Sequence, residues 1–441
     1  MPDGMSDQNG FEWIEGTFGL EPSWSKEPDA NIISQVTRKQ LNLSHDTPIE
    51  VVFQYKGAFT KLYKITSPVS ACSMRISLPV DPIYRTESAV AVVGFIRQQT
   101  SISSPHVIAY SAESSNELGF EWLLMGHAPG IPLYKVWRKL SWDAKVAVVE
   151  QLAEHQAQLF KHEFHKIGNL YLREDGFVVD RLISSSHYQG DHVTNRVIRG
   201  PFTSSHEWLK TRLQRVLAEQ QRIIDTSCDE DEIEDAEFAH NLAQQLCELL
   251  ATVFLPSASA TEATVLFHHS LSMYNISIDG DGNLSEVMDW ECVSAVPVWR
   301  ACRLPELFEE RVREAKPLKE NYSPDSDEDD DKDDDGLDNE GITDLYWEHL
   351  LEYELTQLRE IFLREMDKKS PGWSVLAKQA ILKNDFERAV EECDNGWRNK
   401  SVRRWVDSLA AGEPRSLIDM FLSDPEIDQV SQTSMDWEKA E

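Results

Sequence analysis

The sequence predicts an α+β protein with two lobes, a small β-rich N-terminal lobe and a larger helical C-terminal lobe. Short runs typical of strands follow one another up to residue 125. The stretch GHAPGIP cannot continue a strand and indicates a hinge, and beyond it apolar residues recur with the helical period. The expected order is an extension (1–44), the β-rich lobe (45–125), the hinge (126–132), the helical lobe (133–421) and a tail (422–441).

Composition indicates a globular protein and excludes several kinds of partner. The 441 residues are 41% hydrophobic and include 13 Trp, which is ample material for a core. A net charge of −33 argues against a general nucleic-acid or anionic-membrane surface, so we expect neither partner. No run approaches the about 18 consecutive apolar residues of a membrane span, and no signal peptide is apparent. Six scattered Cys without a CxxC pair predict a reduced, cytoplasmic setting.

The extension and the first part of the β-rich lobe are predicted from short local patterns. The first 30 residues are polar but carry Trp13, Phe18 and Trp24, so we expect them to lie over the body of the protein. Residues 32–43 are an amphipathic helix candidate. Two strands, 51–54 and 62–65, flank a turn at 56–60.

A third strand, MRISL at residues 74–78, contains one cation, Arg75. A charge inside an apolar strand needs a partner because an unpaired buried charge is costly. A helix is expected to open at Ser88, and residues 100–110 and 120–125 read as two further strands.

The helical lobe is predicted from apolar periodicity, and it contains one strongly acidic segment. Residues 323–341 hold eleven Asp or Glu against one Lys, so this insert cannot bury enough apolar surface to fold and we expect disorder. A solvated loop, a loose Ca²⁺ site and a tether for a basic protein partner remain open for it. The helical stretches are 143–160, 206–251 (interrupted by the acidic run CDEDEIEDAE), 346–366, 385–392 and 403–409.

Residues 266–291, LFHHSLSMYNISIDGDGNLSEVMDWE, carry the chemistry. An Asp-Gly pair between two β-leaning runs predicts a hairpin. Asn275 opens the first run and Asp289 closes the second, so pairing brings both to one end of the ribbon. An amide and a carboxylate oxygen suit a hard cation such as Mg²⁺.

This spacing resembles the catalytic and metal segment of the protein-kinase-like fold, H-x-D-L-x-x-x-N, a hairpin and an Asp. His268, Leu271, Asn275 and Asp289 match the motif positions. Further segments of the sequence resemble the aminoglycoside phosphotransferase family, specifically its large fungal branch. These segments are the WE after that Asp, VSAVPVW, PVDPIYRTES, GFEWLLM, FHKIGNLY and GPF.

The resemblance implies a bilobal kinase-like fold that binds ATP (or GTP) with Mg²⁺ and transfers a phosphoryl group to an unknown small-molecule acceptor. Acceptor specificity is expected around residues 185–250. In the family pattern, His268 is a structural residue of the catalytic loop, and the other site residues divide between the nucleotide and the metal. The nucleotide positions are Gly57 and Phe59 in the phosphate-covering loop, Arg75 on the phosphates, and Met125 and His127 at the adenine; the metal ligands are Asn275 and Asp289.

Two positions depart from the family pattern. The catalytic Asp falls on Ser270, whose hydroxyl has no useful basicity at neutral pH. The Glu that would clamp Arg75 falls on Ala89, and Glu87 lies about 100° around the helix from it. Two hypotheses follow, an impaired phosphotransferase or a pseudokinase that acts as a nucleotide-binding or interaction protein. Zinc at His268 and His269 is a weaker interpretation because adjacent strand residues face opposite sides, and Ser270 lacks the G-x-S-x-G setting of a nucleophile.

Overall fold

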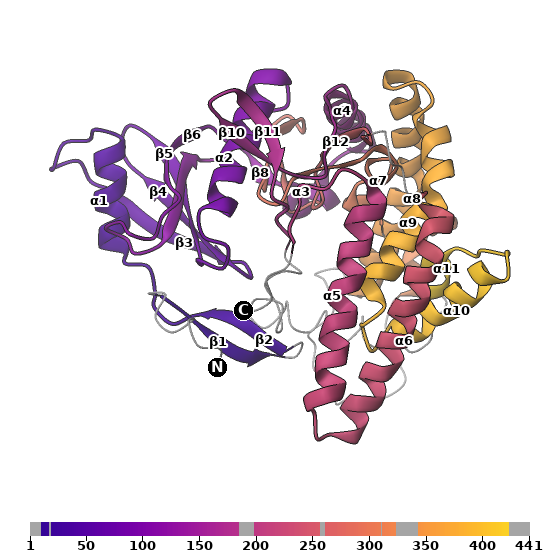
Figure 1. Cartoon of the computed structure of the whole chain (residues 1–441). Helices are drawn as coiled ribbons and strands as arrows, with labels where there is room; N and C mark the ends of the chain where they lie inside the picture. Colours follow the sequence, from indigo (N-terminus) through magenta and orange to yellow (C-terminus); the bar gives the residue numbers. More distant parts are fainter. Residues whose placement is uncertain are drawn as a thin grey trace, which may run out of the picture.

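The computed structural model describes residues 10–16, 19–184, 198–255, 261–309, 311–322 and 343–422. The acidic insert and the tail beyond Leu422 lie outside the described residues. Figure 1 shows the strands of the small lobe on one side and the long helices on the other. The predicted fold class, α+β with a small β-rich lobe and a larger helical lobe, is confirmed.

The small lobe is a five-stranded antiparallel sheet in the order β3-β4-β5-β7-β6. Buried and partly exposed residues alternate along β4, as expected of a strand with one face on a core. Ile33 and Val36 of α1 pack into that core. The bounds are α1 Ala30–Gln40, β3 Glu50–Lys56, β4 Thr60–Thr66, β5 Ala71–Ser77, β6 Val107–Ser111 and β7 Glu121–Gly126.

Helix α2 (Tyr84–Gln99) joins the two lobes. Its residues Val92, Phe95 and Ile96 belong to the main core of the large lobe, and its buried residues lie all around the helix, as in a fully enclosed helix. The predicted start at Ser88 is wrong by one turn. Ile83, with a φ of +74°, precedes the helix, and its backbone N–H donates to Glu121 Oε1 at 3.1 Å.

The N-terminal extension contains an unpredicted hairpin, β1 (Phe11–Gly16) with β2 (Gly19–Trp24). It contacts the small lobe through the Trp24 ring, whose centroid lies 5.2 Å from that of Phe120. The ammonium of Lys61 lies 4.6 Å from the Trp24 ring. The described part of the extension therefore lies over the body as expected, but through a sheet of its own.

The large lobe surrounds two small sheets with long helices. One sheet has the order β11-β10-β15-β12-β9 and the other β14-β13-β8. The strand bounds are β8 Ile131–Pro132, β9 Glu163–Phe164, β10 Gly168–Arg173, β11 Gly176–Asp180, β12 Thr264–Phe267, β13 Ile276–Ile278, β14 Leu284–Val287 and β15 Ser294–Pro297. The helices are α3 Leu133–Val136, α4 Trp142–Phe160, α5 Ser205–Thr226, α6 Glu230–Val253, α7 Val298–Ala301, α8 Asp344–Lys369, α9 Trp373–Glu392, α10 Asn399–Ala410 and α11 Leu417–Leu422, with short 3-10 turns at Trp137–Lys139, Glu306–Phe308 and Lys319–Asn321.

The acidic run near residue 230 begins a helix where we expected an interruption. Asp229 caps α6, accepting from the backbone N–H groups of Asp231 and Glu232. Acidic residues in a first turn also complement the helix dipole, so only residues 227–229 break the helical stretch. Throughout the described ranges, no helix is both long enough and apolar enough to span a membrane.

Candidate functional site

The predicted hairpin is present as β13 and β14, with Ile276 opposite Val287. Asp279 Oδ1 shapes the turn by accepting from the N–H groups of Asp281 and Asn283, both at 2.9 Å. One residue beyond the paired ends, Met288 N–H donates to Asn275 O at 2.8 Å. The hairpin therefore brings Asn275 and Asp289 to the same end of the ribbon, as the sequence predicts.

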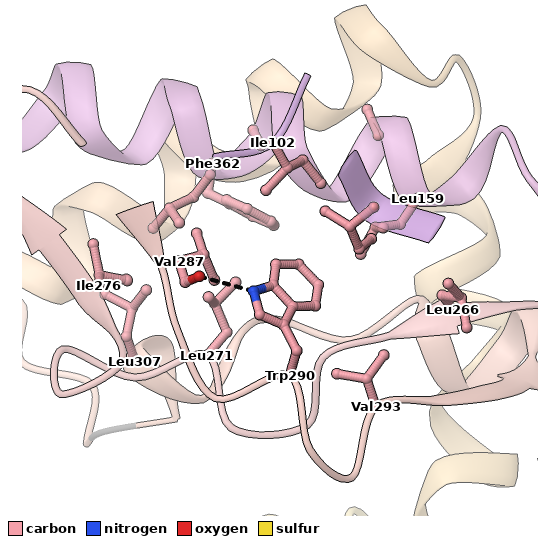
Figure 2. Packing of buried hydrophobic residues seen from close by; sticks show 14 of the residues in the cluster. Ile102, Leu159, Leu266, Leu271, Ile276, Val287, Trp290, Val293, Leu307 and Phe362 are labelled. Atoms are coloured by element: carbon pink, nitrogen blue, oxygen red, sulfur yellow. Dashed lines mark hydrogen bonds between the residues drawn. The ribbon is translucent and has the colours of Figure 1, made fainter. Parts of the chain in front are cut away.

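Buried side chains hold the segment that presents Asp289. Figure 2 shows the indole of Trp290 enclosed by apolar side chains, with its Nε1–H donating to Val287 O at 2.8 Å. His268 donates from Nε2 to Met288 O at 2.9 Å, so its role in holding the loop is structural. Asp289 itself has a φ of +57°, an uncommon conformation for a non-glycine residue that persists where the surroundings impose it.

Asn275 and Asp289 fit the oxygen chemistry of a bound Mg²⁺. The Asn275 side-chain N–H donates to Ser270 O at 2.8 Å, which orients the amide and leaves its oxygen on the opposite side. Burial is the main cause that raises the pKa of the Asp289 carboxyl, and the negative charge of Glu291 is the second. A bound cation would offset both effects. Among the described residues no three His, Cys, Asp or Glu form a metal cluster, so other ligands would come from phosphate and water.

Arg75 has a partner that the sequence did not predict. Its Nη1 lies 3.0 Å from Glu291 Oε2, and Arg85 of α2 pairs with the other oxygen of Glu291. Glu87 instead pairs with Arg173 at 3.1 Å, so it does not substitute for the missing helix Glu. The expectation that Ala89 leaves Arg75 without a clamp is therefore wrong, because the clamp comes from the segment after Asp289.

The loop between β3 and β4 covers this cluster. Gly57 N–H donates to Thr60 O at 2.8 Å, which closes the predicted turn. The Phe59 ring lies 5.1 Å from the Arg85 guanidinium. Tyr55 on β3, which we did not predict, is close enough to Asp289 for that charge to add to the effect of burial in raising the pKa of the phenol.

The predicted hinge is shorter than expected because both of its ends are strands. Met125 lies in β7, between Ser73 and Val107. His127 is held to β5, with Nδ1 2.9 Å from Ser73 Oγ and its backbone N–H donating to Ala71 O at 3.3 Å. That N–H, expected to meet an adenine ring, is thus used within the protein.

A glycine at the far end of the hinge connects it to the catalytic hairpin. Residues 131 and 132 form β8, which pairs with β13. Gly130 has a φ of +94°, and a Cβ there would lie 2.3 Å from Ile278 O. Only glycine fits this close approach, so the hinge and the hairpin share one small sheet.

Ser270 lines a cavity of about 500 Å³, which we call the Ser270 cavity. Part of its lining comes from the region where acceptor specificity was expected, although residues 185–197 lie outside the described residues. Phe267, His269 and Ser270 of the lining belong to the segment 266–291 that the sequence singled out, whereas the lining residues from 300–309 and from α9 were not predicted, because they lie far along the chain. The charged residues of the lining are Arg212, Arg215, Arg300, Arg303, Glu306, Glu309, Glu387 and Glu391.

Glu306 is the carboxylate of this cavity that is tied most directly to the catalytic loop. The next residue, Leu307, donates its N–H to Leu271 O at 3.1 Å. Burial, then the charges of Glu309 and Asp289, raise the pKa of Glu306, which places Asp289 within electrostatic range. Glu306 is nevertheless open to solvent. No local motif marks it, since it is separated from Ser270 by 36 residues of sequence.

His268 and His269 do not form a zinc site. His268 stacks edge-on against Trp290, with ring centroids 4.9 Å apart, whereas His269 Nε2 lies 2.8 Å from Ser294 Oγ. Burial lowers the pKa of both imidazoles. The two rings thus have separate partners, and both residues lie just beyond the end of β12 rather than within a strand.

Comparison with solved structures returns the family that the sequence motifs resemble. The structure is similar to those of aminoglycoside phosphotransferases. An ADP-bound APH(2'')-Ib superposes with a TM-score of 0.47 and 11% identity, covering 89% of this chain and 97% of that chain. A gentamicin complex of APH(2'')-IIa gives 0.45 and 11%, covering 91% and 98%. No protein-family model matches the sequence.

The curated relatives match a limited segment. A subtelomeric hrmA-associated cluster protein of Aspergillus fumigatus is 30% identical over 129 residues, 27% of this chain and 25% of that protein. Altered inheritance of mitochondria protein 9, mitochondrial, of Debaryomyces hansenii is 30% identical over 162 residues, 33% of this chain and 25% of that protein. The match thus spans about a quarter of these relatives. Several yeast relatives are named as mitochondrial, which overturns the expected cytoplasmic location.

Proposed function

We propose that this chain transfers the γ-phosphoryl group of ATP to a hydroxyl of a small molecule bound in the Ser270 cavity. The observation that carries the proposal is that Ser270 and Glu306 line one cavity beside the Asn275–Asp289 end of the hairpin. Glu306 offers a carboxylate where the family's catalytic Asp is replaced by Ser. Its raised pKa makes it a stronger base than an ordinary carboxylate.

In the proposed reaction the acceptor oxygen forms a bond to the γ-phosphorus while the bond from that phosphorus to the bridging oxygen breaks. ADP leaves with the electron pair, and the hydroxyl proton passes to Glu306 and then to solvent. Arg75 and Arg85, which share Glu291, would supply positive charge to the phosphates. Asn275 and Asp289 would hold Mg²⁺, which neutralises phosphate charge when bound.

The first test is a thermal-shift titration of the full chain with Mg-ATP, repeated on Asp289→Ala. A ligand that binds only the folded state raises the melting temperature, so we expect a shift that the variant loses. ADP formation is then followed with a panel of sugars, polyols and organic acids. Glu306→Gln should lower the rate by about 10²–10⁴-fold, whereas Glu309→Gln, on the same cavity, should not. No shift at millimolar Mg-ATP would sink the proposal.

A second candidate is a nucleotide-binding or interaction protein without catalysis. The observation that favours it is that Arg75 and Arg85 are already neutralised in part by Glu291, together with Ser270 at the family's catalytic position. For this candidate, Mg-ATP binds but no member of the panel supports ADP formation. Ser270→Asp would leave that result unchanged.

We also infer a mitochondrial location, which rests on the names of the yeast relatives. Fractionation of cells expressing the tagged full chain tests it. Recovery of the protein outside the mitochondrial fraction would contradict the inference.

A further inference from the structure

One wall of the Ser270 cavity is a cluster of guanidinium groups. Arg212 and Arg215 come from α5, Arg300 comes from α7, and Arg303 follows α7. Phosphotransferase acceptors that are polycationic, such as the gentamicin bound in the APH(2'')-IIa complex, would meet repulsion from such a wall. The charge of the wall therefore bears directly on which acceptor fits.

One ionised carboxylate, Glu387 of α9, holds three of these arginines in place. It is 1% exposed and lies 2.8 Å from Arg212, 3.5 Å from Arg300 and 3.7 Å from Arg303. Burial alone would raise the pKa of Glu387, but the charges of the three arginines lower it to about 2. The carboxylate is thus charged at all physiological pH values, and it balances only one of the three guanidinium groups.

The other carboxyl groups of the lining, Glu306, Glu309 and Glu391, offset part of this positive charge. Burial, and then the charge of Glu387, raise the pKa of Glu391, which favours its neutral form. Glu309 is shared between Arg303 at 3.3 Å and Arg388 at 3.8 Å, and it lies in the exposed part of the lining with Glu306. Arg215 adds a fourth cation, and burial followed by the charge of Arg212 lowers its pKa to about 10, so it stays protonated at neutral pH.

Two N–H groups of the Arg300 guanidinium make no hydrogen bond to any of the described residues. Its Nε and Nη1 are buried without such a partner, although Nε is in ion-pair range of Glu387. Buried N–H groups without a hydrogen-bond partner destabilise the folded protein. An oxyanion in the cavity would accept from a guanidinium in the geometry that carboxylates and phosphates share.

We propose that the Ser270 cavity binds a small organic anion, a hydroxylated carboxylate or phosphate ester, through Arg300 and Arg215. This anion would be the acceptor of the proposed phosphotransferase. Its phosphorylation rests on that proposed function, but its binding does not. The cavity of about 500 Å³ suits a metabolite-sized molecule. The arginines of this wall would repel a cationic aminoglycoside.

The test measures binding to the full chain by calorimetry without nucleotide, using glycerol, D-glycerate and glycerol 3-phosphate. These probes have the same three-carbon chain length but differ in charge, so we expect the two anions to bind and neither glycerol nor gentamicin to do so. A preference between the two anions distinguishes a carboxylate from a phosphate ligand. Arg300→Gln and Arg215→Gln should each weaken binding at least about tenfold, which corresponds to about 1.4 kcal/mol.

Matched variants show whether the anion binds at this cavity or elsewhere on the protein. Arg313→Gln removes an equally paired arginine, 2.8 Å from Glu352 and outside the cavity, and should leave anion binding unchanged. Arg75→Gln should also leave it unchanged, which excludes binding at the nucleotide phosphates. Circular dichroism checks that each variant is folded.

Two outcomes would overturn the inference: neither anion binds at millimolar concentration, or both bind equally well to the Arg300 and Arg215 variants. Anion binding without any Mg-ATP binding would overturn the proposed function alone. Mg-ATP binding without anion binding would overturn this inference alone.

Discussion

Arg75 Nη1 lies 3.0 Å from Glu291 Oε2, so the cation of the third sheet strand is paired with the segment that presents Asp289. Both side chains are about nine-tenths buried, and Arg85 of α2 shares the same carboxylate. The ion cluster therefore joins the small lobe, the helix between the lobes and the catalytic segment. Loss of the Glu291 carboxylate should affect all three.

Glu291→Gln keeps the shape of the side chain but removes the carboxylate that Arg75 and Arg85 share. Removing one partner of a buried ion pair typically costs about 3–5 kcal/mol, and we expect that loss in the free energy of unfolding measured with urea. Burial alone would raise the pKa of Glu291, but the charges of Arg75 and Arg85 lower it. The stabilisation by the Glu291 carboxylate is fully present above the unfolded-state pKa of 4.5, and it is lost as the pH falls through the lower pKa of the folded state. The difference in unfolding free energy between the wild type and Glu291→Gln should therefore become smaller in acid.

The control for this prediction is Glu117→Gln, which removes an exposed ion pair with Lys39. Exposed pairs contribute less than about 1 kcal/mol. Equal losses for Glu291→Gln and Glu117→Gln would show that the ion cluster does not stabilise the fold.

Glu121 should make the folded state less stable as pH rises. Burial raises its pKa to about 7, even though Thr86 Oγ1 and Ile83 N–H both donate to the carboxylate. The folded state thus binds the proton more tightly than the unfolded state, so stability should fall by about 3 kcal/mol between pH 4.5 and pH 7. Glu121→Gln should flatten this dependence in urea titrations at several pH values; an unchanged slope would contradict the assignment.

Trp290→Phe tests the hydrogen bond that holds the turn before Asp289. A smaller aromatic ring remains, and Val287 O loses its donor at 2.8 Å, so we expect a loss of at least about 1–3 kcal/mol in unfolding free energy. Mg-ATP binding should weaken as well, because Asp289 is the preceding residue. Trp397→Phe, at a residue 59% exposed, serves as the control and should change neither quantity.

Restoring the family's carboxylate should rescue the loss of Glu306. If Glu306 accepts the proton, Ser270→Asp in the Glu306→Gln background should recover at least about tenfold of the lost rate of ADP formation. In the wild-type background the same substitution should change the rate little, because a base is already present. A large gain in both backgrounds would show that Glu306 does not act as the base.

The hairpin and its two oxygen ligands could be predicted because they depend on neighbouring residues. Two short β-leaning runs pair across an Asp-Gly turn within the 15 residues from Asn275 to Asp289. That pairing alone decides which side chains lie at the same end of the hairpin. The hinge was placed for a similar reason, since Gly and Pro interrupt strands locally. The hairpin β1–β2 was missed because its strands are short and Gly and Pro residues, which favour irregular chain, interrupt the sequence.

The sequence by itself thus determined the two-lobed plan, the hinge and the position of Asn275 and Asp289 at one end of the hairpin, all of which follow from local periodicity and turn chemistry. Only the tertiary structure decided that Glu291 pairs with Arg75 and that Glu306 lies beside the Ser270 loop. It also placed Glu387 in the same cavity as Ser270. Charge partners across more than 100 residues are chosen by burial, because an unpaired ion in a core must be neutralised by whichever opposite charge the packed elements bring within reach.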